Sequence, residues 1–478
     1  MIALTFPIKG DEEYLDKLMT FYCHTYNIMV KEARSRLTRL RRDPRYRELI
    51  NKYKSDKKFT PEEKEELKSL RKEYGLSQSN YEKYLKKQNV YKIAHSAIVQ
   101  KIACRVWQAT EKCLFDNGKE IHFKKRSSFT SFEAKSVKTG IKYINGHLEI
   151  NKHCYHIFIR KNDTFAKESL KHKISFCRIL RKWYKNRWRY YVQFVVDAPG
   201  KQISCANGTI GIDIGPSTIA VDSENGSFIQ ELNQEVESIQ EEIKTLNQKI
   251  DTFQRKNNPQ NYNPDGTIKR NTKSFKKVWN KSKPQIKLEH KRKDLYRLKR
   301  EKTILSQHIL AKEILSLGNI VIIEDMQFDA LAKRAKETEV NKNGHYKSKK
   351  RFGKSILEHA PAQFLNILKY NIEKAGGLYI EVDCFKTAAT QFDHTSGAFN
   401  KHKLNERFIV LDNGDIIQRD LHSAFNLRHI KILEDGSYEY DIESMNAHYA
   451  DFKIRHNDLI NDLKLLMYMG INIPSSII

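Results

Sequence analysis

The sequence has few of the features that identify secreted, membrane or zinc-ribbon proteins. Its seven cysteines are scattered and none stands in a C-x-x-C pair, so neither a zinc ribbon nor a disulfide framework is predicted. No apolar run approaches the roughly 20 residues of a spanning helix, and the start, MIALTFPIKGDEEYLDK, has no secretion-signal pattern. We therefore expect free thiols, a cytoplasmic protein and no membrane partner.

Acidic residues are the minority among the charged ones. The chain has 86 Lys and Arg against 58 Asp and Glu, a formal net charge of +28. A polyanion is the simplest partner for such a chain, and nucleic acid is the usual one. With 39% hydrophobic and 10% aromatic residues over 478 positions, the chain can fill the cores of two to four domains.

The N-terminal part predicts two modules. Residues 11–118 carry charged helical patterns, whereas residues 1–10 and 119–200 alternate like strands and form a predicted β module. In this β module aromatic and basic residues occur together, and such residues can stack on bases and contact phosphates. An ordinary β core with solvated lysines is the alternative for each of them. The candidate nucleic-acid contacts are Lys124, Lys125, Trp183 and Arg187.

One acid stands in the middle of an apolar strand pattern, GTIGIDIGPSTIAVDSENG, at residues 208–226. Because side chains alternate along a strand, Asp213 points away from the face of Ile212 and Ile214. A carboxylate in such a strand costs several kcal/mol unless it is paired or binds a metal.

Two further acids have a related context. Glu324 ends the apolar strand pattern of GNIVIIEDMQF, where only it or Asp325 can face the same side, and Asp420 opens a helix in QRDLHSAFNL. Strand–helix–strand connections favour a parallel sheet with ligands at the carboxyl ends of its strands. Crowded carboxylates repel unless a divalent cation neutralises them. We therefore predict that Asp213, Glu324 and Asp420 hold two Mg²⁺ ions, with Mn²⁺ able to substitute, for phosphodiester hydrolysis; Asp383 is a weaker candidate that a structural role would explain equally.

Two insertions are predicted in this domain. The spacing of Leu232, Val236, Ile239, Ile243, Leu246, Ile250 and Phe253 is that of a heptad seam. A second helix over about 286–316 would return against it through Leu295, Leu298, Leu305 and Ile309, giving an antiparallel hairpin over 231–316; a dimerising coiled coil is the alternative. Residues 385–418 contain the turn patterns DHTSG and LDNGD, which predict a β ribbon. Residues 433–478 are expected to be a helical extension.

The segments IGIDIGPSTIAV, IVIIEDMQF and QRDLHSAFNL resemble the three RuvC-type motifs of TnpB, the transposon-encoded RNA-guided DNA endonuclease related to type V CRISPR effectors and Fanzor proteins. APAQFLNILKYNIEKAGG followed by YIEVD is similar to the segment between the second and third motifs. The resemblance implies an RNase H-like (RuvC) α/β nuclease domain over 208–384 and 419–432, with the hairpin and the ribbon inserted. It also implies a helical recognition lobe and a wedge-like β-barrel before this domain.

The resemblance implies an activity and its partners as well. A guide RNA made from the protein's own locus would direct cleavage of double-stranded DNA beside a short motif, in the cytoplasm of a prokaryote. The matching positions are Asp213, Glu324 and Asp420 as metal ligands and Gln100 as a contact to the target-adjacent motif. Monomer and dimer both stay open.

The sequence departs from the family in two places. The family's four-cysteine zinc ribbon is missing, because no cysteine follows Cys384 and His394 and His402 alone cannot close a zinc site. We expect no structural zinc in the 385–418 ribbon, which is still predicted to contact the target nucleic acid, with Arg407 as a phosphate contact. In the third motif His422 and Ser423 replace Asn and Ala.

Other functions fit parts of the sequence. GIDIGPST is similar to the first phosphate loop of actin/Hsp70-type ATPases, but no second phosphate hairpin follows. A nuclease-dead RNA-guided repressor is the nearer alternative, although all three acids are present. A plain sequence-specific DNA-binding protein would need no carboxylate trio, and no zinc finger or helix-turn-helix is evident.

Overall fold

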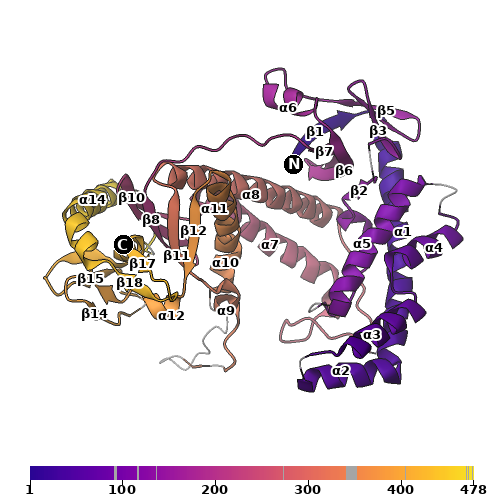
Figure 1. The fold of residues 1–478 in the computed structure, drawn as a ribbon. Coiled ribbons are helices and arrows are strands. Elements are labelled where there is room, and N and C mark those ends of the chain that lie inside the picture. Colours follow the sequence, from indigo (N-terminus) through magenta and orange to yellow (C-terminus); the bar gives the residue numbers. More distant parts are fainter. Residues whose placement is uncertain are drawn as a thin grey trace. The chain divides into compact units, whose positions relative to one another are not determined.

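The chain folds into two units, Met1–Gly200 and Lys201–Ile478, each described by itself in this computed structural model (Figure 1). The structure describes residues 1–56, 58–90, 94–115, 118–135, 137–272, 274–337, 339–340, 352–403, 405–469, 471, 473–475 and 477. Among them, no helix is both long and apolar enough to cross a membrane.

The first unit contains a group of helices with well-defined starts. Asp11 caps α1 by accepting a hydrogen bond from the Tyr14 N–H at 2.8 Å, and Thr60 and Glu63 form a capping box at the start of α3. Helices α1 and α5 pack against each other. The helices are α1 (Glu12–Arg42), α2 (Pro44–Asp56), α3 (Pro61–Glu73), α4 (Gln78–Lys87), α5 (Ser96–Phe115) and the short α6 (Thr164–Ser169).

The same unit holds an antiparallel seven-stranded sheet in the order β2-β6-β7-β1-β5-β4-β3. Its longest pair, β6 and β7, turns at Lys185 and Asn186, whose φ angles of 43° and 69° suit a tight hairpin. Strand structure was expected from residue 119, but 126–128 form the 3₁₀ turn η2 (Arg126–Ser128). The strands are β1 (Ile2–Lys9), β2 (Ser131–Glu133), β3 (Ile141–Ile144), β4 (His147–Ile150), β5 (His153–Ile157), β6 (Ile174–Tyr184) and β7 (Arg187–Val196).

A five-stranded mixed sheet organises the second unit, in the order β10-β9-β8-β11-β12. Strands β8, β11 and β12 are parallel, as the strand–helix–strand pattern predicts, and β9 runs antiparallel to β8 and β10. Ile212 of β8 pairs with Ile323 of β11, so the two strands end at the same level. The strands are β8 (Thr209–Ile214), β9 (Thr218–Ser223), β10 (Gly226–Glu231), β11 (Ile320–Glu324) and β12 (Leu378–Val382).

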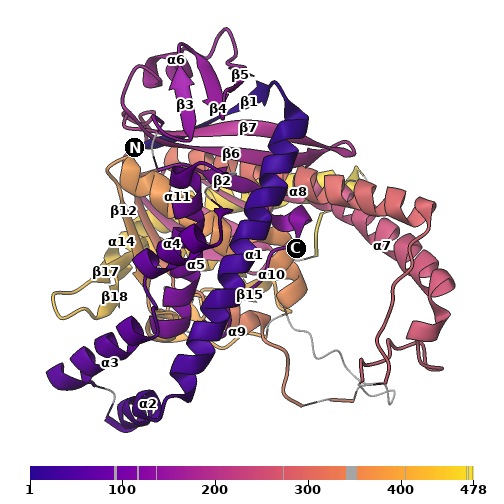
Figure 2. The same cartoon turned by 90° about the vertical axis from the view of Figure 1, so that its right-hand side faces the viewer.

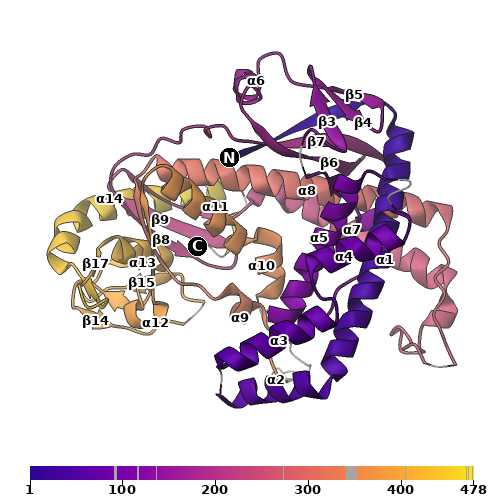
Figure 3. The same cartoon turned by 45° about the vertical axis from the view of Figure 1, so that its right-hand side comes forward.

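Helices cover both faces of this sheet. On one face, Ile212 and Ile323 are buried against α8 (Lys283–Leu315) and α11 (Pro361–Lys374). On the other face α13 (Arg419–Arg428) crosses β8 and β9 (Figure 3). Gly211 allows the close approach, because a Cβ atom there would lie 1.9 Å from the Ala424 carbonyl oxygen.

The predicted hairpin consists of α7 (Glu237–Asn257) and α8, which run antiparallel (Figure 2). Arg292 donates to Asn247 at 2.8 Å, and Lys291 pairs with Glu242 at 2.6 Å. The second helix lies where it was predicted, but Leu305 and Ile309 were assigned to its seam incorrectly, because they are 60% and 58% exposed.

The cause of this error is that the C-terminal half of α8 packs on the sheet rather than along α7. Leu310, Ala311 and Ile314 therefore form its buried face. At the other end of the seam, Leu232 precedes α7 and Val236 lies in the 3₁₀ turn η3 (Gln234–Val236). The heptad spacing identified the helical pair, but tertiary packing determined which residues are buried.

The segments after β11 are shorter. The ribbon expected over 385–418 forms two small hairpins, and the extension after 433 is not wholly helical, since β18 pairs with β17 before α14 begins. The elements are α9 (Phe328–Ala332), α10 (Gly353–His359), α12 (Cys384–Thr387), β13 (Phe392–Asp393), β14 (Ala398–Phe399), β15 (Phe408–Val410), β16 (Ile416–Gln418), β17 (Ile430–Ile432), β18 (Tyr438–Tyr440) and α14 (Ile442–Tyr468), besides the turn η4 (Pro259–Asn261) in the hairpin loop.

Candidate active site

The structure brings the three predicted acids together at one edge of the five-stranded sheet. Asp213 lies near the end of β8, Glu324 is the last residue of β11, and Asp420 is the second residue of α13. Asp213 alternates with the buried Ile212 and Ile214, so it shares the face of β8 that Gly211 offers to α13. A strand position, a strand end and a helix start therefore contribute one carboxylate each.

The same alternation decides between Glu324 and its neighbour Asp325. Ile322 packs with Leu427 of α13, and Ile323 packs with the core on the opposite face. Glu324 follows Ile322 by two residues and faces α13, whereas Asp325 follows Ile323 and faces away. The sequence left this choice open, and the register of the sheet settles which acid shares a face with Asp213.

The carboxylate of Asp213 experiences the repulsion of its neighbours. Part of its surface stays accessible, yet burial is the largest cause that raises its pKa well above the usual value, followed by the charges of Asp420 and Glu324. A hydrogen bond from Ser423 and the charge of Arg419 act in the opposite direction but do not cancel the effect. This is the signature of acids held close together without enough positive charge between them.

Backbone and side-chain donors hold Glu324 in place. The Ala389 N–H and the Thr387 hydroxyl both donate to its Oε1 at 2.9 Å. These bonds only partly offset burial, which raises the Glu324 pKa. Asp383, the weaker candidate, accepts a hydrogen bond from the Phe385 N–H at 2.9 Å and caps α12, which is a structural role.

Two arginines hold the carboxylate of Asp420. Nη2 and Nε of Arg419 donate to its Oδ1 at 2.8 and 3.0 Å, and Nη1 of Arg407 lies 3.4 Å from its Oδ2. Arg407, predicted as a phosphate contact, thus contacts a candidate metal ligand directly. Both oxygens of Asp420 face guanidinium groups.

The donor set suits a hard divalent cation by its chemistry, because carboxylate oxygens are the ligands that Mg²⁺ and Mn²⁺ prefer. In the described part of the chain, however, no group of three His, Cys, Asp or Glu side chains is arranged so that it could hold a metal ion. Arg419 and Arg407 contact the oxygens that Asp420 would offer. Metal binding therefore requires that Asp420 share these oxygens with the arginines or turn away from them.

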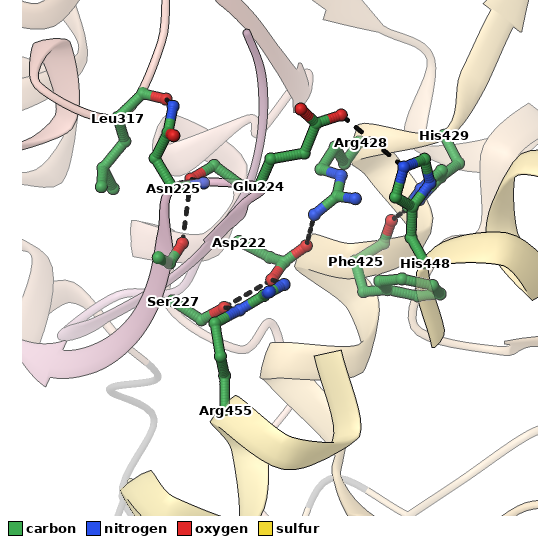
Figure 4. A network of polar contacts seen from close by, with 12 residues as sticks. Asp222, Glu224, Asn225, Ser227, Leu317, Phe425, Arg428, His429, His448 and Arg455 are labelled. Atoms are coloured by element: carbon green, nitrogen blue, oxygen red, sulfur yellow. Dashed lines mark hydrogen bonds and ion pairs between the residues drawn. The ribbon is translucent and has the colours of Figure 1, made fainter. Parts of the chain in front are cut away.

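A second ion network anchors the other end of α13 (Figure 4). Asp222 of β9 is fully buried and accepts from Nη1 of Arg428 at 2.8 Å, from the Ser227 hydroxyl at 2.5 Å and from Nη2 of Arg455 of α14 at 3.3 Å. Burial raises the pKa of Asp222 and lowers that of Arg428. This network joins the sheet, α13 and α14.

Helix α13 also holds the ribbon. Asn426 donates to the carbonyl oxygens of Ala389 and Phe392 at 2.9 and 2.8 Å. On the same helix, Nε2 of His422 lies 3.0 Å from Nδ1 of His394, and burial lowers the His422 pKa to about 3. His422 and His394 are thus a buried, neutral pair that packs the first ribbon hairpin on α13.

The remaining predicted contacts belong to the first unit. Gln100 is half-buried on α5, Lys125 and Arg187 are exposed, and Lys124 lies with its Nζ 5.0 Å from the Tyr26 ring, where burial lowers its pKa. Trp183 packs edge-on against Trp188 at 5.2 Å between ring centroids. These five residues remain predicted nucleic-acid contacts.

Several residues at the site were not predicted from the sequence. Arg419 directly precedes Asp420, and Ser423 follows it by three positions. The helical period could therefore have suggested Ser423, and sequence adjacency Arg419. Thr387 had no signal, because its contact to Glu324 spans 63 positions and depends on how α12 returns to the sheet.

Comparison with known proteins gives weak similarities. No protein-family model matches the chain, and no curated protein matches it. A cryo-EM structure of a Cas12f1–sgRNA–target DNA complex is similar at 10% identity and a TM-score of 0.47, over 87% of this chain and 84% of that chain. A CRISPR-Cas12f ternary complex is similar at 13% identity and a TM-score of 0.29, over 87% and 82%. Function is therefore inferred from the residues of the chain itself.

Proposed function

We propose that the protein is an RNA-guided DNA endonuclease of the TnpB kind, which cleaves double-stranded DNA by metal-dependent phosphodiester hydrolysis. The observation that carries this proposal is that Asp213 and Glu324 lie on the sheet face covered by α13, whose second residue is Asp420, and that burial and the charges of both other acids raise the pKa of Asp213. A net charge of +28 supports a polyanionic substrate. The sequence motifs support the guided mode of action, and an RNase H-like fold for the second unit is part of the proposal.

Each residue of the site has a separate proposed role. Asp213, Glu324 and Asp420 would hold Mg²⁺, which supplies an activated water and stabilises the leaving oxygen of a phosphodiester. Thr387 and the Ala389 N–H fix the direction of Glu324. Arg419 and Arg407 hold Asp420 and place positive charge where a substrate phosphate would lie.

The other modules would bind the guide RNA and the target. We propose that the helices of 11–118 and the β module of 1–10 and 119–200 hold an RNA–DNA heteroduplex through its backbone and shape. Gln100 would contact the target-adjacent motif, and the 385–418 ribbon would guide DNA toward the acids. Base pairing, rather than protein contacts, would then read most of the sequence.

A nuclease-dead, RNA-guided repressor is the second candidate function. The observation that favours it is the pairing of both Asp420 oxygens with arginines in the absence of a converged ligand set among the described residues. Such a protein would keep guided DNA binding and lose cleavage.

One experiment separates these functions. The protein is expressed with its native flanking DNA and purified, its bound RNA is sequenced, and cleavage of a matching target is assayed with Mg²⁺. A discrete RNA from the edge of its locus together with cleavage is the expected result. A discrete RNA with target binding but no cleavage supports the repressor, and heterogeneous or absent RNA contradicts both guided functions.

A further inference from the structure

A cleft of about 880 Å³ lies at the same edge of the sheet as the three acids, beside the start of the helical hairpin. One wall begins at Glu231, the last residue of β10. Because β8 and β10 are both antiparallel to β9, β10 ends at the edge where β8 carries Asp213. Strands two places apart in a sheet are roughly 10 Å apart, so the cleft begins within a few nucleotide lengths of the candidate active site.

The rim of the cleft is built from interlocking contacts. Asn233 lies in the left-handed region with φ of 60°, and its Nδ2 donates to the His359 carbonyl oxygen. In return Nδ1 of His359 donates to the Leu232 carbonyl oxygen at 2.6 Å, and its Nε2 lies 3.5 Å from Glu231. These contacts fix the segment after β10 against the end of α10.

Asn233 also has an unused acceptor. The residue is 5% exposed and lines the cleft, and its Oδ1 has no hydrogen-bond partner among the described residues. A buried amide oxygen without a donor costs about 1–3 kcal/mol. The oxygen itself is buried, so a hydrogen-bond donor at this wall would reach it only if the Asn233 amide turned toward the cleft.

The cleft wall is amide-rich and balanced in charge. Four acidic and four basic side chains line it, so it is not a phosphate-binding basic pocket. Amide side chains offer donors and acceptors together, which is the chemistry that recognises the edges of nucleobases. Tyr296, which is 51% exposed, presents an aromatic ring in the same cleft. The amides are Asn233, Gln234, Gln240, Asn247, Gln248 and Gln363.

We propose that this cleft binds one unpaired nucleotide of the nucleic acid that reaches the three acids, with its base stacked on Tyr296 and its edge facing the amides. This inference rests on the proposed function, because it assumes that the substrate is nucleic acid. The volume lies in the roughly 300–1,000 Å³ range of small-ligand sites. A protein partner would instead need about 800 Å² of surface on each side, which makes a nucleotide the better occupant.

The test uses the full-length protein without metal and a short fluorescent single-stranded oligodeoxynucleotide that carries one photo-reactive 4-thiothymidine. Binding is measured at high salt, where phosphate contacts weaken and base stacking persists. We expect crosslinks to the cleft segments of α7 or α8 and roughly tenfold weaker binding by Tyr296→Ala. Tyr468→Ala is the matched control, because Tyr468 is a 91% exposed aromatic residue at the end of α14, and it should bind like the unchanged protein.

An abasic nucleotide sharpens the test. Placed at the crosslinked position, it should weaken binding to the unchanged protein by a factor similar to that of Tyr296→Ala and cause no further loss in that variant. A full additional loss in the variant, or crosslinks that avoid the cleft, would overturn the proposal. So would a Tyr296→p-benzoylphenylalanine variant that crosslinks to another protein in place of the oligonucleotide. Because binding is measured without cleavage, a failed cleavage assay leaves this result standing, and the two failures are distinguishable.

Discussion

Helix α13 carries an aspartate–arginine network at each end, and the two networks differ in what surrounds them. At its C-terminal end, Asp222 is fully buried and both its oxygens are paired, with Arg428 and Arg455 as partners. At its N-terminal end, Asp420 is 9% exposed and likewise lies against two arginines, Arg419 and Arg407.

The difference lies in the neighbouring acids. Burial is the main cause that raises the pKa of Asp222, and its arginines counteract it. The pKa of Asp213, beside Asp420, is raised by burial and further by two other carboxylates. Aspartate–arginine pairing therefore balances the buried charge at the C-terminal end of α13. At the N-terminal end the same pairing leaves an excess of negative charge. An excess of negative charge is expected of a site that binds cations. Keeping the repelling carboxylates together lowers the free energy of unfolding of the metal-free protein.

The largest expected effect tests the proposed cleavage site at the N-terminal end of α13. Asp213→Ala should reduce guided DNA cleavage by roughly a thousandfold or more, because metal-based charge stabilisation is worth several kcal/mol. Guided binding of the target should stay unchanged, and gel shifts and cleavage assays on one preparation measure both. Asp325→Ala is the matched control, since Asp325 faces away from the site. Retained cleavage in Asp213→Ala would remove this residue from the active site.

The sequence predicted the positions of the acids in the sheet better than the contacts around them. Alternation and strand ends placed Asp213 and Glu324 near the carboxyl ends of two parallel strands, because those patterns are local. The contacts of Thr387, 63 positions from Glu324, and the burial pattern of α8 depend on chain segments that meet only after folding. Leu305 and Ile309 were therefore assigned to a seam with α7. In the folded protein this half of α8 packs on the sheet, and that packing determines which of its residues are buried. The prediction of a wholly helical extension over 433–478 was wrong for the same reason, because β18 forms only by pairing with β17.

The next effect concerns the structural end of the comparison. Asp222→Asn should destabilise α13 and α14 by about 3 kcal/mol or more, because it leaves Arg428 buried without a full counter-charge. Hydrogen exchange followed by mass spectrometry, on peptides of both helices, measures this local free energy of opening. Asp251→Asn, which breaks the exposed Arg255–Asp251 pair, is the control and should leave exchange unchanged. Equal protection in Asp222→Asn and the unchanged protein would contradict a structural role for the network.

A pH effect of about 2 kcal/mol should come from His429, which follows α13 directly. Burial, together with the charge of Arg428 and the neighbouring His448, lowers its pKa to about 4, while a hydrogen bond to the Phe425 carbonyl and the charge of Asp441 act the other way. Between pH 6.5 and 4 the unfolded state takes up a proton that the folded state does not. Stability is therefore present above pH 6.5 and falls as the pH drops, by at most about 1.4 kcal/mol per unit.

The measurement compares urea unfolding at pH 7 and pH 5 for the unchanged protein and for His429→Asn, which can keep the hydrogen bond but cannot titrate. The pH difference in unfolding free energy should shrink by about 2 kcal/mol in the variant. His308→Asn, at an exposed position on α8, is the matched control. If His429→Asn shows the same pH difference as the control, the titration belongs to other groups.

Removing one charge from the three carboxylates at the N-terminal end of α13 should have a smaller effect, and it should raise stability rather than lower it. Asp213→Asn should raise the unfolding free energy of the metal-free protein by about 1 kcal/mol, since it removes one of three repelling carboxylates. Asp222→Asn, the same chemical change at the other end of the helix, should lower it. Calorimetry in the presence of a chelator provides the comparison. Destabilisation by Asp213→Asn would indicate that its charge is already balanced in the folded protein.

The smallest expected effect is that of a zinc chelator on the ribbon. Asp393 accepts from the Thr395 N–H and the Asp412 N–H, both at 2.9 Å, and Asn426 holds two ribbon carbonyls. These bonds fix the hairpin starts, which is the role that metal ligands have in a zinc ribbon. Elemental analysis should find no stoichiometric zinc, and 1,10-phenanthroline should leave hydrogen exchange of the ribbon unchanged, whereas Asp393→Asn should accelerate it. One zinc per chain would show that a metal rather than α13 holds this segment. So would ribbon hydrogen exchange that the chelator accelerates and Asp393→Asn leaves unchanged.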